Sequence, residues 1–254
     1  EGMLWEPIPS FSGQFKGNGH TISDLTITGQ YSPAGLFGIV EEQGSIESLS
    51  VRGVVSVSDS ADTTTGGIAG INHGTLISCQ FTGVVTGDSE VGGIVGRNES
   101  EGTIDHSTAR AIVTGKSSTG GIAGYNLGAI TGCTNVGSIN TEYPEASLDT
   151  DGFTAKMVDY INNKMAAADD DATNSVTNVA TDTGGIAGRS SGMILTSVNT
   201  GTIGYEHVGY NVGGIVGRTD GLVSGCVNQG RVLGRKDVGG IAGQAEPYRC
   251  LLYT

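Results

Sequence analysis

Arginine occurs three times and tyrosine once at one position of a repeated glycine-rich unit, and these side chains can contact acidic sugars. The unit reads Gly-Gly-Ile-(Ala/Val)-Gly and occurs at 66–70, 92–96, 120–124, 184–188, 213–217 and 239–243. The residues that directly follow it are Ile71, Arg97, Tyr125, Arg189, Arg218 and Gln244. A guanidinium group presents a planar set of donors to carboxylates, and a tyrosine ring can stack on a sugar. Because this position varies within a uniform repeat, we expect an outward strip that either contacts an acidic glycan or is a solvated face.

A second candidate site is the most aromatic connecting segment, residues 205–211. It contains Tyr205, His207 and Tyr210 within seven residues. These side chains could contact a ligand, or they could pack against the non-repetitive segment that precedes them. Both interpretations stay open at the level of sequence.

The cysteines predict structure rather than chemistry. Cys79, Cys133 and Cys226 each lie twelve residues after the second glycine of a unit, a phase that serine and leucine occupy in other copies. Side chains at a position that such residues share are small or apolar, so we expect buried thiols. Cys79 and Cys133 would lie two coils apart, about 9–10 Å at the strand spacing, which is too far for a disulfide bridge.

No arrangement of titratable residues predicts catalysis. The four histidines fall in different phases of the repeat, without the HExxH or GxSxG patterns of hydrolases. The run Asp169-Asp170-Asp171 lacks the alternating ligand spacing and glycine of a calcium loop. Acidic residues before the glycine pairs, such as Glu90, Asp182 and Asp237, are typical of charged loop tips. We therefore predict no catalytic residue, no metal site and no cofactor.

The spacing of the glycine-rich units predicts the fold that would position these side chains. Their second glycines lie 26, 28, 64, 29 and 26 residues apart. Almost all variation in length falls just before the next glycine pair, so the long spacing is one repeat plus about 38 inserted residues at a permitted loop. Each unit offers three short β-prone pieces, too short for independent hairpins but suited to parallel stacking. We predict a right-handed parallel β-helix, or β-solenoid, of about seven coils.

Four segments follow from this pattern: an N-terminal cap and coils (1–140), an insertion (141–178), C-terminal coils (179–248) and a non-native tail (249–254). In the insertion, Phe153, Met157, Ile161 and Met165 recur every four residues, which predicts an amphipathic α-helix. The ending CLLYT can be encoded by TGT-CTC-TTA-TAC-ACA, which matches a transposon sequencing adapter, so we expect a fragment. Trp5, Phe11 and Phe15 would shield the first coil.

Two sets of asparagines recur in phase. They are Asn72, Asn98 and Asn126 in one set and Asn135, Asn199 and Asn228 in the other. Stacked amides can hydrogen-bond along a solenoid, so we predict ladders, with glycan contact as the alternative.

Composition limits the partners of the chain. The formal net charge is −13, and glycine accounts for 44 of the 254 residues. Nucleic acid and anionic membrane surfaces attract basic proteins, so neither is an expected partner. An acidic chain rich in glycine, serine and threonine is typical of an exported protein, and no direct membrane insertion is expected.

The units GG(I/L)(A/V)G and the opening FSGQFKGNGHTI resemble the GLUG-motif repeats of bacterial surface proteins, over residues 5–247. The resemblance implies a non-catalytic, extracellular repeat domain that serves as a stalk, display scaffold or adhesin, with a host or bacterial glycan or glycoprotein as partner. Such repeats also occur beside secreted metallopeptidases that cleave immunoglobulin A. A substrate-recognition region of such a peptidase is therefore an alternative, and a carbohydrate-active β-helix enzyme is a third.

Overall fold

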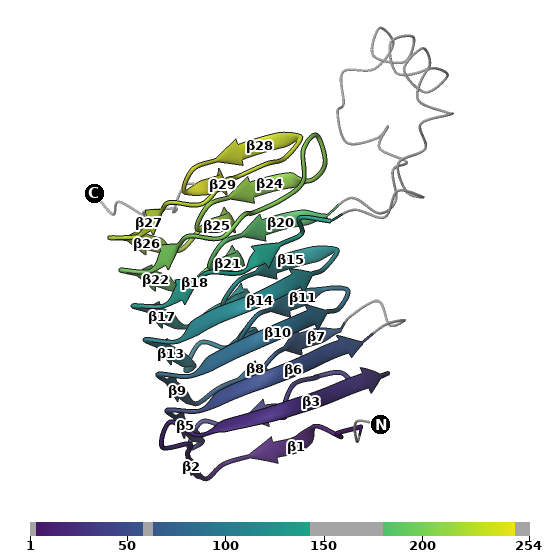
Figure 1. Ribbon diagram of the computed structural model, residues 1–254. Helices are drawn as coiled ribbons and strands as arrows, with labels where there is room; N and C mark the ends of the chain where they lie inside the picture. Colours follow the sequence, from purple (N-terminus) through teal and green to yellow (C-terminus); the bar gives the residue numbers. More distant parts are fainter. Residues whose placement is uncertain (1–3, 58–62, 143–179, 247–254) are drawn as a thin grey trace, which may run out of the picture.

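The computed structural model describes residues 4–57, 63–142 and 180–246, and over these residues the protein is an all-β parallel solenoid of about seven coils. Successive coils stack in chain order from the N-terminal to the C-terminal end (Figure 1). This confirms the solenoid predicted from the repeat spacing. Except for residues 141 and 142, the insertion and its predicted helix lie outside the described residues, as does the tail.

Each coil contributes short strands to four sheets, and every paired strand runs parallel to its neighbours. Sheet A contains β1 (Ile8–Phe11), β4 (Phe37–Val40), β8 (Ala69–Asn72), β12 (Val95–Asn98), β16 (Ala123–Asn126), β21 (Ala187–Ser190), β25 (Val216–Thr219) and β29 (Ala242–Ala245). Sheet B contains β2 (Gln14–Lys16), β5 (Ser45–Glu47), β9 (Thr75–Ile77), β13 (Thr103–Asp105), β17 (Ala129–Thr131), β22 (Met193–Leu195) and β26 (Leu222–Ser224).

Sheets C and D complete each coil. Sheet C contains β3 (Thr21–Gly29), β6 (Ser50–Val57), β10 (Gln80–Thr86), β14 (Thr108–Thr114), β18 (Thr134–Asn135), β19 (Ser138–Ile139), β23 (Val198–Asn199) and β27 (Val227–Asn228). Sheet D contains β7 (Thr64–Gly66), β11 (Glu90–Gly92), β15 (Ser117–Gly120), β20 (Thr181–Gly184), β24 (Tyr210–Gly213) and β28 (Lys236–Gly239). The three β-prone pieces expected per repeat are thus four strands, because the glycine-rich piece bends between sheets D and A.

The core is a set of columns in which equivalent residues of successive coils lie above one another. The isoleucine of the glycine-rich unit forms one column, in which Ile68, Ile94, Ile122, Ile186 and Ile215 are fully buried. Alternation along each strand sends one side chain inward and the next outward, so every coil adds the same thin layer of aliphatic side chains.

The glycine pairs allow close stacking of the coils. None of them has a positive φ, so a left-handed backbone is not the reason for glycine. A Cβ atom on Gly93 would lie 2.2 Å from the carbonyl oxygen of Gly121 in the next coil. A Cβ atom on Gly67 would lie 2.3 Å from the ring of Phe81, which comes from sheet C across the core. The second glycine therefore leaves room for both the next coil and the opposite sheet.

The corner between sheets B and C is a single residue in the left-handed conformation. The residues there are Ser48, Ser78, His106, Gly132, Thr196 and Gly225, with φ of 50°, 53°, 46°, 61°, 46° and 65°. Positive φ is strained for residues other than glycine, yet four of these six corners carry another residue. The parallel strands on either side hold that residue in place.

Both predicted asparagine ladders are present. In sheet A, Asn72 Nδ2 donates to Asn98 Oδ1 (2.8 Å) and Asn98 Nδ2 donates to Asn126 Oδ1 (2.9 Å). In sheet C, Asn135 donates to Asn199 and Asn199 to Asn228, both at 2.8 Å. The ladders run along the solenoid axis through the interior, so these amides belong to the scaffold rather than to a ligand site.

Aromatic rings close the N-terminal end of the core. Phe11 and Phe15 pack on Phe37, with ring centroids 5.0 and 5.8 Å away. Trp5 is exposed, so the phenylalanines rather than Trp5 shield the first layer.

Candidate functional site

The arginine–tyrosine column runs along the outer face of sheet A. Register pairs Arg97 with Tyr125, Tyr125 with Arg189 and Arg189 with Arg218, one residue per coil. Ile71 and Gln244 extend the column at its two ends. The preceding glycine and the following residue of each strand are buried, whereas the column residues are half-buried. Strand alternation thus brings these four predicted site residues together on one surface.

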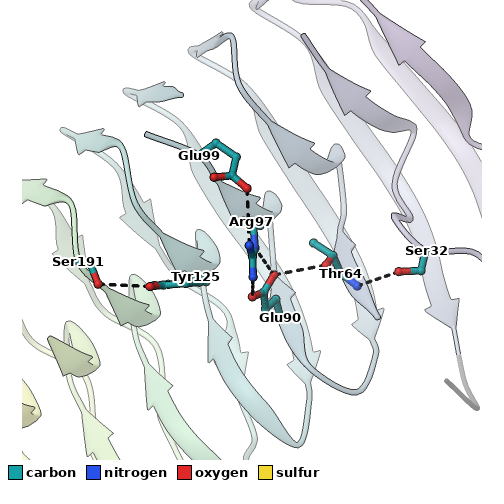
Figure 2. Close-up of polar contacts among 7 residues, drawn as sticks. All are labelled: Ser32, Thr64, Glu90, Arg97, Glu99, Tyr125 and Ser191. Carbon is teal, nitrogen blue, oxygen red and sulfur yellow. Dashed lines mark hydrogen bonds and ion pairs between the residues drawn. The ribbon is translucent and has the colours of Figure 1, made fainter. Parts of the chain in front are cut away.

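Arg97 is neutralised by two carboxylates. Its Nε donates to Glu90 Oε2 at 2.6 Å and its Nη2 pairs with Oε1 of the same residue, while Glu99 lies 3.6 Å from Nη1 (Figure 2). Thr64 Oγ1 also donates to Glu90, at 3.3 Å. The hydrogen bonds to Glu90 raise the pKa of Arg97 above its usual value. Arg97 is therefore a positioned, charge-compensated residue.

Tyr125 lies between the guanidinium groups of the neighbouring coils. The Cζ atoms of Arg97 and Arg189 are 5.4 and 5.3 Å from the ring centroid, within the range of cation–π contacts. The phenol oxygen is 3.3 Å from Ser191 Oγ (Figure 2). Because a guanidinium approaches from each neighbouring coil, a ligand would meet the tyrosine hydroxyl and ring edge rather than a free ring face.

Arg218 and Arg189 differ in charge compensation. Arg218 forms an ion pair with Glu246 of the next coil, and the hydrogen bond to that carboxylate raises the pKa of Arg218. Among the residues that the structure describes, no carboxylate forms an ion pair with Arg189. The uncompensated positive charge of the column is therefore at Arg189, next to the hydroxyl groups of Tyr125 and Ser191.

The 205–211 loop forms a separate surface. Tyr205 and Val208 line a hollow of about 340 Å³, together with residues such as Lys116, which pairs with Asp88 at 2.6 Å. Tyr210 lies in β24, where Arg235 is 5.8 Å from its ring centroid. His207 is exposed and is not among the residues that line the hollow. The column residues do not line this hollow either, so the sequence-derived candidates form two surfaces rather than one.

The thiols are structural. Cys79 and Cys133 are buried, as expected, whereas Cys226, one coil before the last, is only half-buried. Burial raises the pKa of the Cys79 thiol to about 11 and that of Cys133 to about 12. Thiols held in the protonated form are poor nucleophiles. Over residues 4–57, 63–142 and 180–246, no group of three or more His, Cys, Asp and Glu side chains is placed to hold a metal ion.

Two further arginines were not predicted from the repeat pattern. Arg52 and Arg110 project from the outer face of sheet C, where both are exposed. Each directly precedes the residue that ends the regular part of the repeat, Gly53 or Ala111. That shared phase was a signal for a second column, but other copies carry different residues there.

In the described part of the chain, no helix has the length and apolar character needed to cross a membrane.

The fold and the outward columns define a parallel β-solenoid repeat domain, and one copy of its repeat matches a known family model. Residues 87–114 match the family model described as the GLUG motif. This match covers the connection before one glycine pair and the coil that follows it. It confirms the GLUG resemblance predicted from the repeated units.

Two curated proteins are similar to parts of the chain. Halomucin of Haloquadratum walsbyi is 35% identical over 117 residues, which cover 43% of this chain and 1% of halomucin. A Gly-rich membrane protein of Evansella cellulosilytica is 29% identical over 140 residues, which cover 40% of this chain and 16% of that protein. The chain thus spans a small part of each relative. No solved structure matches it significantly.

Proposed function

We propose that this chain is a non-catalytic repeat domain of an extracellular surface protein, which displays a binding surface for acidic glycans. The GLUG match and the similarity to halomucin and to a protein named as a Gly-rich membrane protein support a surface location. The solenoid supports a display role, because parallel strands and internal amide ladders hold the outward columns at fixed positions.

The observation that carries the binding role is the charge of Arg189. In a chain with net charge −13, one guanidinium of the column lacks a carboxylate partner among the described residues, and it lies beside two hydroxyl groups. A terminal sialic acid supplies the missing charge partner, and its hydroxyls can bond to Tyr125 and Ser191. Cell-surface glycans and glycoproteins are the partners that carry such sugars.

Binding of 3′-sialyllactose to the full chain tests this role, with lactose as the neutral reference. We expect Arg189→Gln to weaken sialyllactose binding by on the order of tenfold or more, since the loss removes a charge-assisted contact. Arg231→Gln changes the net charge equally at an exposed position outside the column, so it should leave binding unchanged.

Three outcomes contradict the proposal. They are no preference for sialyllactose over lactose, equal effects of the two substitutions, and cleavage of the glycan. Cleavage would instead indicate the carbohydrate-active enzyme.

A further inference from the structure

The outer face of sheet C carries a second cationic column that is distinct from the arginine–tyrosine column. Register places Thr82 between Arg52 and Arg110, which come from the coils on either side. These residues line a hollow of about 340 Å³ with four other polar residues, Thr21, Ser23, Ser50 and Gln80. The amide of Gln80 donates to Thr82 Oγ1 at 3.3 Å, which orients both side chains along the strand.

Both arginines are exposed, and neither has an ion-pair partner in the part of the chain that the structure describes. Over the described residues, no carboxylate lies within 4 Å of the guanidinium nitrogens of either one. Around Arg110, the neighbouring coil on one side presents Thr82 and β18 lies on the other, so no acidic residue faces it in the sheet. Around Arg52, the coil below contains Ser23 and Asp24 in the irregular part of β3, and Asp24 forms no ion pair with it. An acidic chain thus keeps two free positive charges on one face.

An aliphatic column runs parallel to these arginines. Val54, Val84 and Ile112 pair in register two residues further along the same strands. Val54 is 37% exposed and Ile112 is 46% exposed. The face therefore offers cationic, hydroxyl and apolar groups in adjacent rows, each running along the solenoid axis.

We propose that this face binds a linear acidic polysaccharide that lies along the solenoid axis, with one anionic sugar at Arg52 and another at Arg110. Two strand spacings separate the arginines by about 9.6 Å. This is close to the length of a disaccharide, so the register fits a polymer with an anionic group on every second sugar. The hydroxyl and amide side chains between the arginines can bond to the intervening neutral sugar, and the aliphatic column can pack on the C–H groups of the rings.

Other polyanions fit this face less well. None of the seven lining residues is aromatic, so nucleic-acid bases would find no stacking platform. The net charge of −13 also repels extended anions that carry a charge on every residue or nucleotide. A sparsely charged polymer places its anionic groups only where the arginines lie.

Titration of the full chain with a hyaluronan octasaccharide, which has a carboxylate on every second sugar, tests the proposal. We expect Arg52→Gln and Arg110→Gln each to weaken binding by on the order of tenfold, and the double variant to abolish measurable binding. Asp24→Asn should strengthen binding, because it removes the nearby negative charge. Arg231→Gln is the matched control for net charge, and thermal unfolding shows whether each variant is folded.

The proposal for the sheet C site and the proposal for the Arg189 site can be contradicted separately. Arg189→Gln should leave hyaluronan binding unchanged, and the double sheet C variant should leave sialyllactose binding unchanged. Unaltered hyaluronan affinity in the folded double variant would overturn the proposal. Binding of a poly-glutamate peptide as tight as that of hyaluronan would also overturn it, in favour of a general anion surface.

Discussion

At the residue scale, one inward column of sheet D mixes threonine with valine. Register aligns Thr65, Val91, Thr119, Thr183 and Val212 in successive coils. Over the described residues, the buried hydroxyls of Thr65 and Thr119 have no hydrogen-bond partner. Thr183 Oγ1, in contrast, accepts a hydrogen bond from Asn140 Nδ2 at 3.0 Å. The same residue type therefore has opposite energetic roles in adjacent coils.

Substitution of Thr119 and of Thr183 by valine should change the free energy of unfolding in opposite directions. Thr119→Val removes an unpaired buried hydroxyl at nearly constant shape, and we expect stabilisation by about 1 kcal/mol, or a rise in Tm of about 2–4 °C. Thr183→Val leaves the Asn140 amide without its acceptor, and we expect destabilisation by about 1–3 kcal/mol. Thermal unfolding followed by circular dichroism measures both effects. A loss of stability in both variants would show that the Thr119 hydroxyl has a partner.

The sequence revealed the arginine–tyrosine column but not its electrostatics. The position was predicted because it varies inside a uniform repeat, and the structure places it outward. Which arginine keeps a free charge depends on carboxylates in other parts of the coil or in other coils. Glu90 precedes Arg97 by seven residues, whereas Glu246 reaches Arg218 from the next coil, 28 residues later in the chain. Such pairing depends on side-chain geometry, which repeat spacing does not contain.

At the element scale, the second glycine of each pair is needed only where another coil follows. A Cβ atom on Gly214 would lie 2.2 Å from the carbonyl oxygen of Gly240 and 2.3 Å from Asn228 Nδ2. A Cβ atom on Gly240, the equivalent residue of the last coil, would meet no atom within 4 Å. Both residues have ordinary φ, so the difference between them is steric rather than conformational.

Alanine at these two equivalent positions provides a matched test. We expect Gly214→Ala to destabilise the protein by about 1–3 kcal/mol or more, because the next coil has to shift. Gly240→Ala should change the free energy of unfolding by less than about 0.5 kcal/mol. Equal losses of stability, measured by denaturant unfolding, would contradict a stacking role and indicate a backbone role for the glycine pair.

At the scale of the whole molecule, the sequence predicted the architecture well, because a solenoid is built from one repeated unit. The 26- to 29-residue spacing is one coil, and the phase of Cys79, Ser107 and Cys133 marks one inward column. The corners were harder to predict. A left-handed residue such as His106 or Thr196 is held by its parallel neighbours, and local preference alone would have placed glycine there.

The two ends of the solenoid bury their cores differently, and this should appear in their dynamics. Phe11, Phe15 and Phe37 cover the first layer. In the last coil, by contrast, Val238 is 45% exposed and Ile241 is 42% exposed, whereas the equivalent Val212 and Ile215 one coil earlier are buried. Stability in a solenoid comes from interfaces between neighbouring coils, and among the described residues the last coil has such an interface on one side only.

Amide hydrogen exchange should therefore be fastest at this end of the described structure. We expect backbone amides in 236–245 to exchange at least about tenfold faster than those in 117–126, after correction for the rates of the unfolded chain. Both segments contain one sheet D strand and one sheet A strand, so sequence and fold are matched and only the stacking differs. Mass spectrometry of peptic fragments measures the two segments in one experiment. Equal protection would show that the last coil is covered and that the solenoid unfolds as a single cooperative unit.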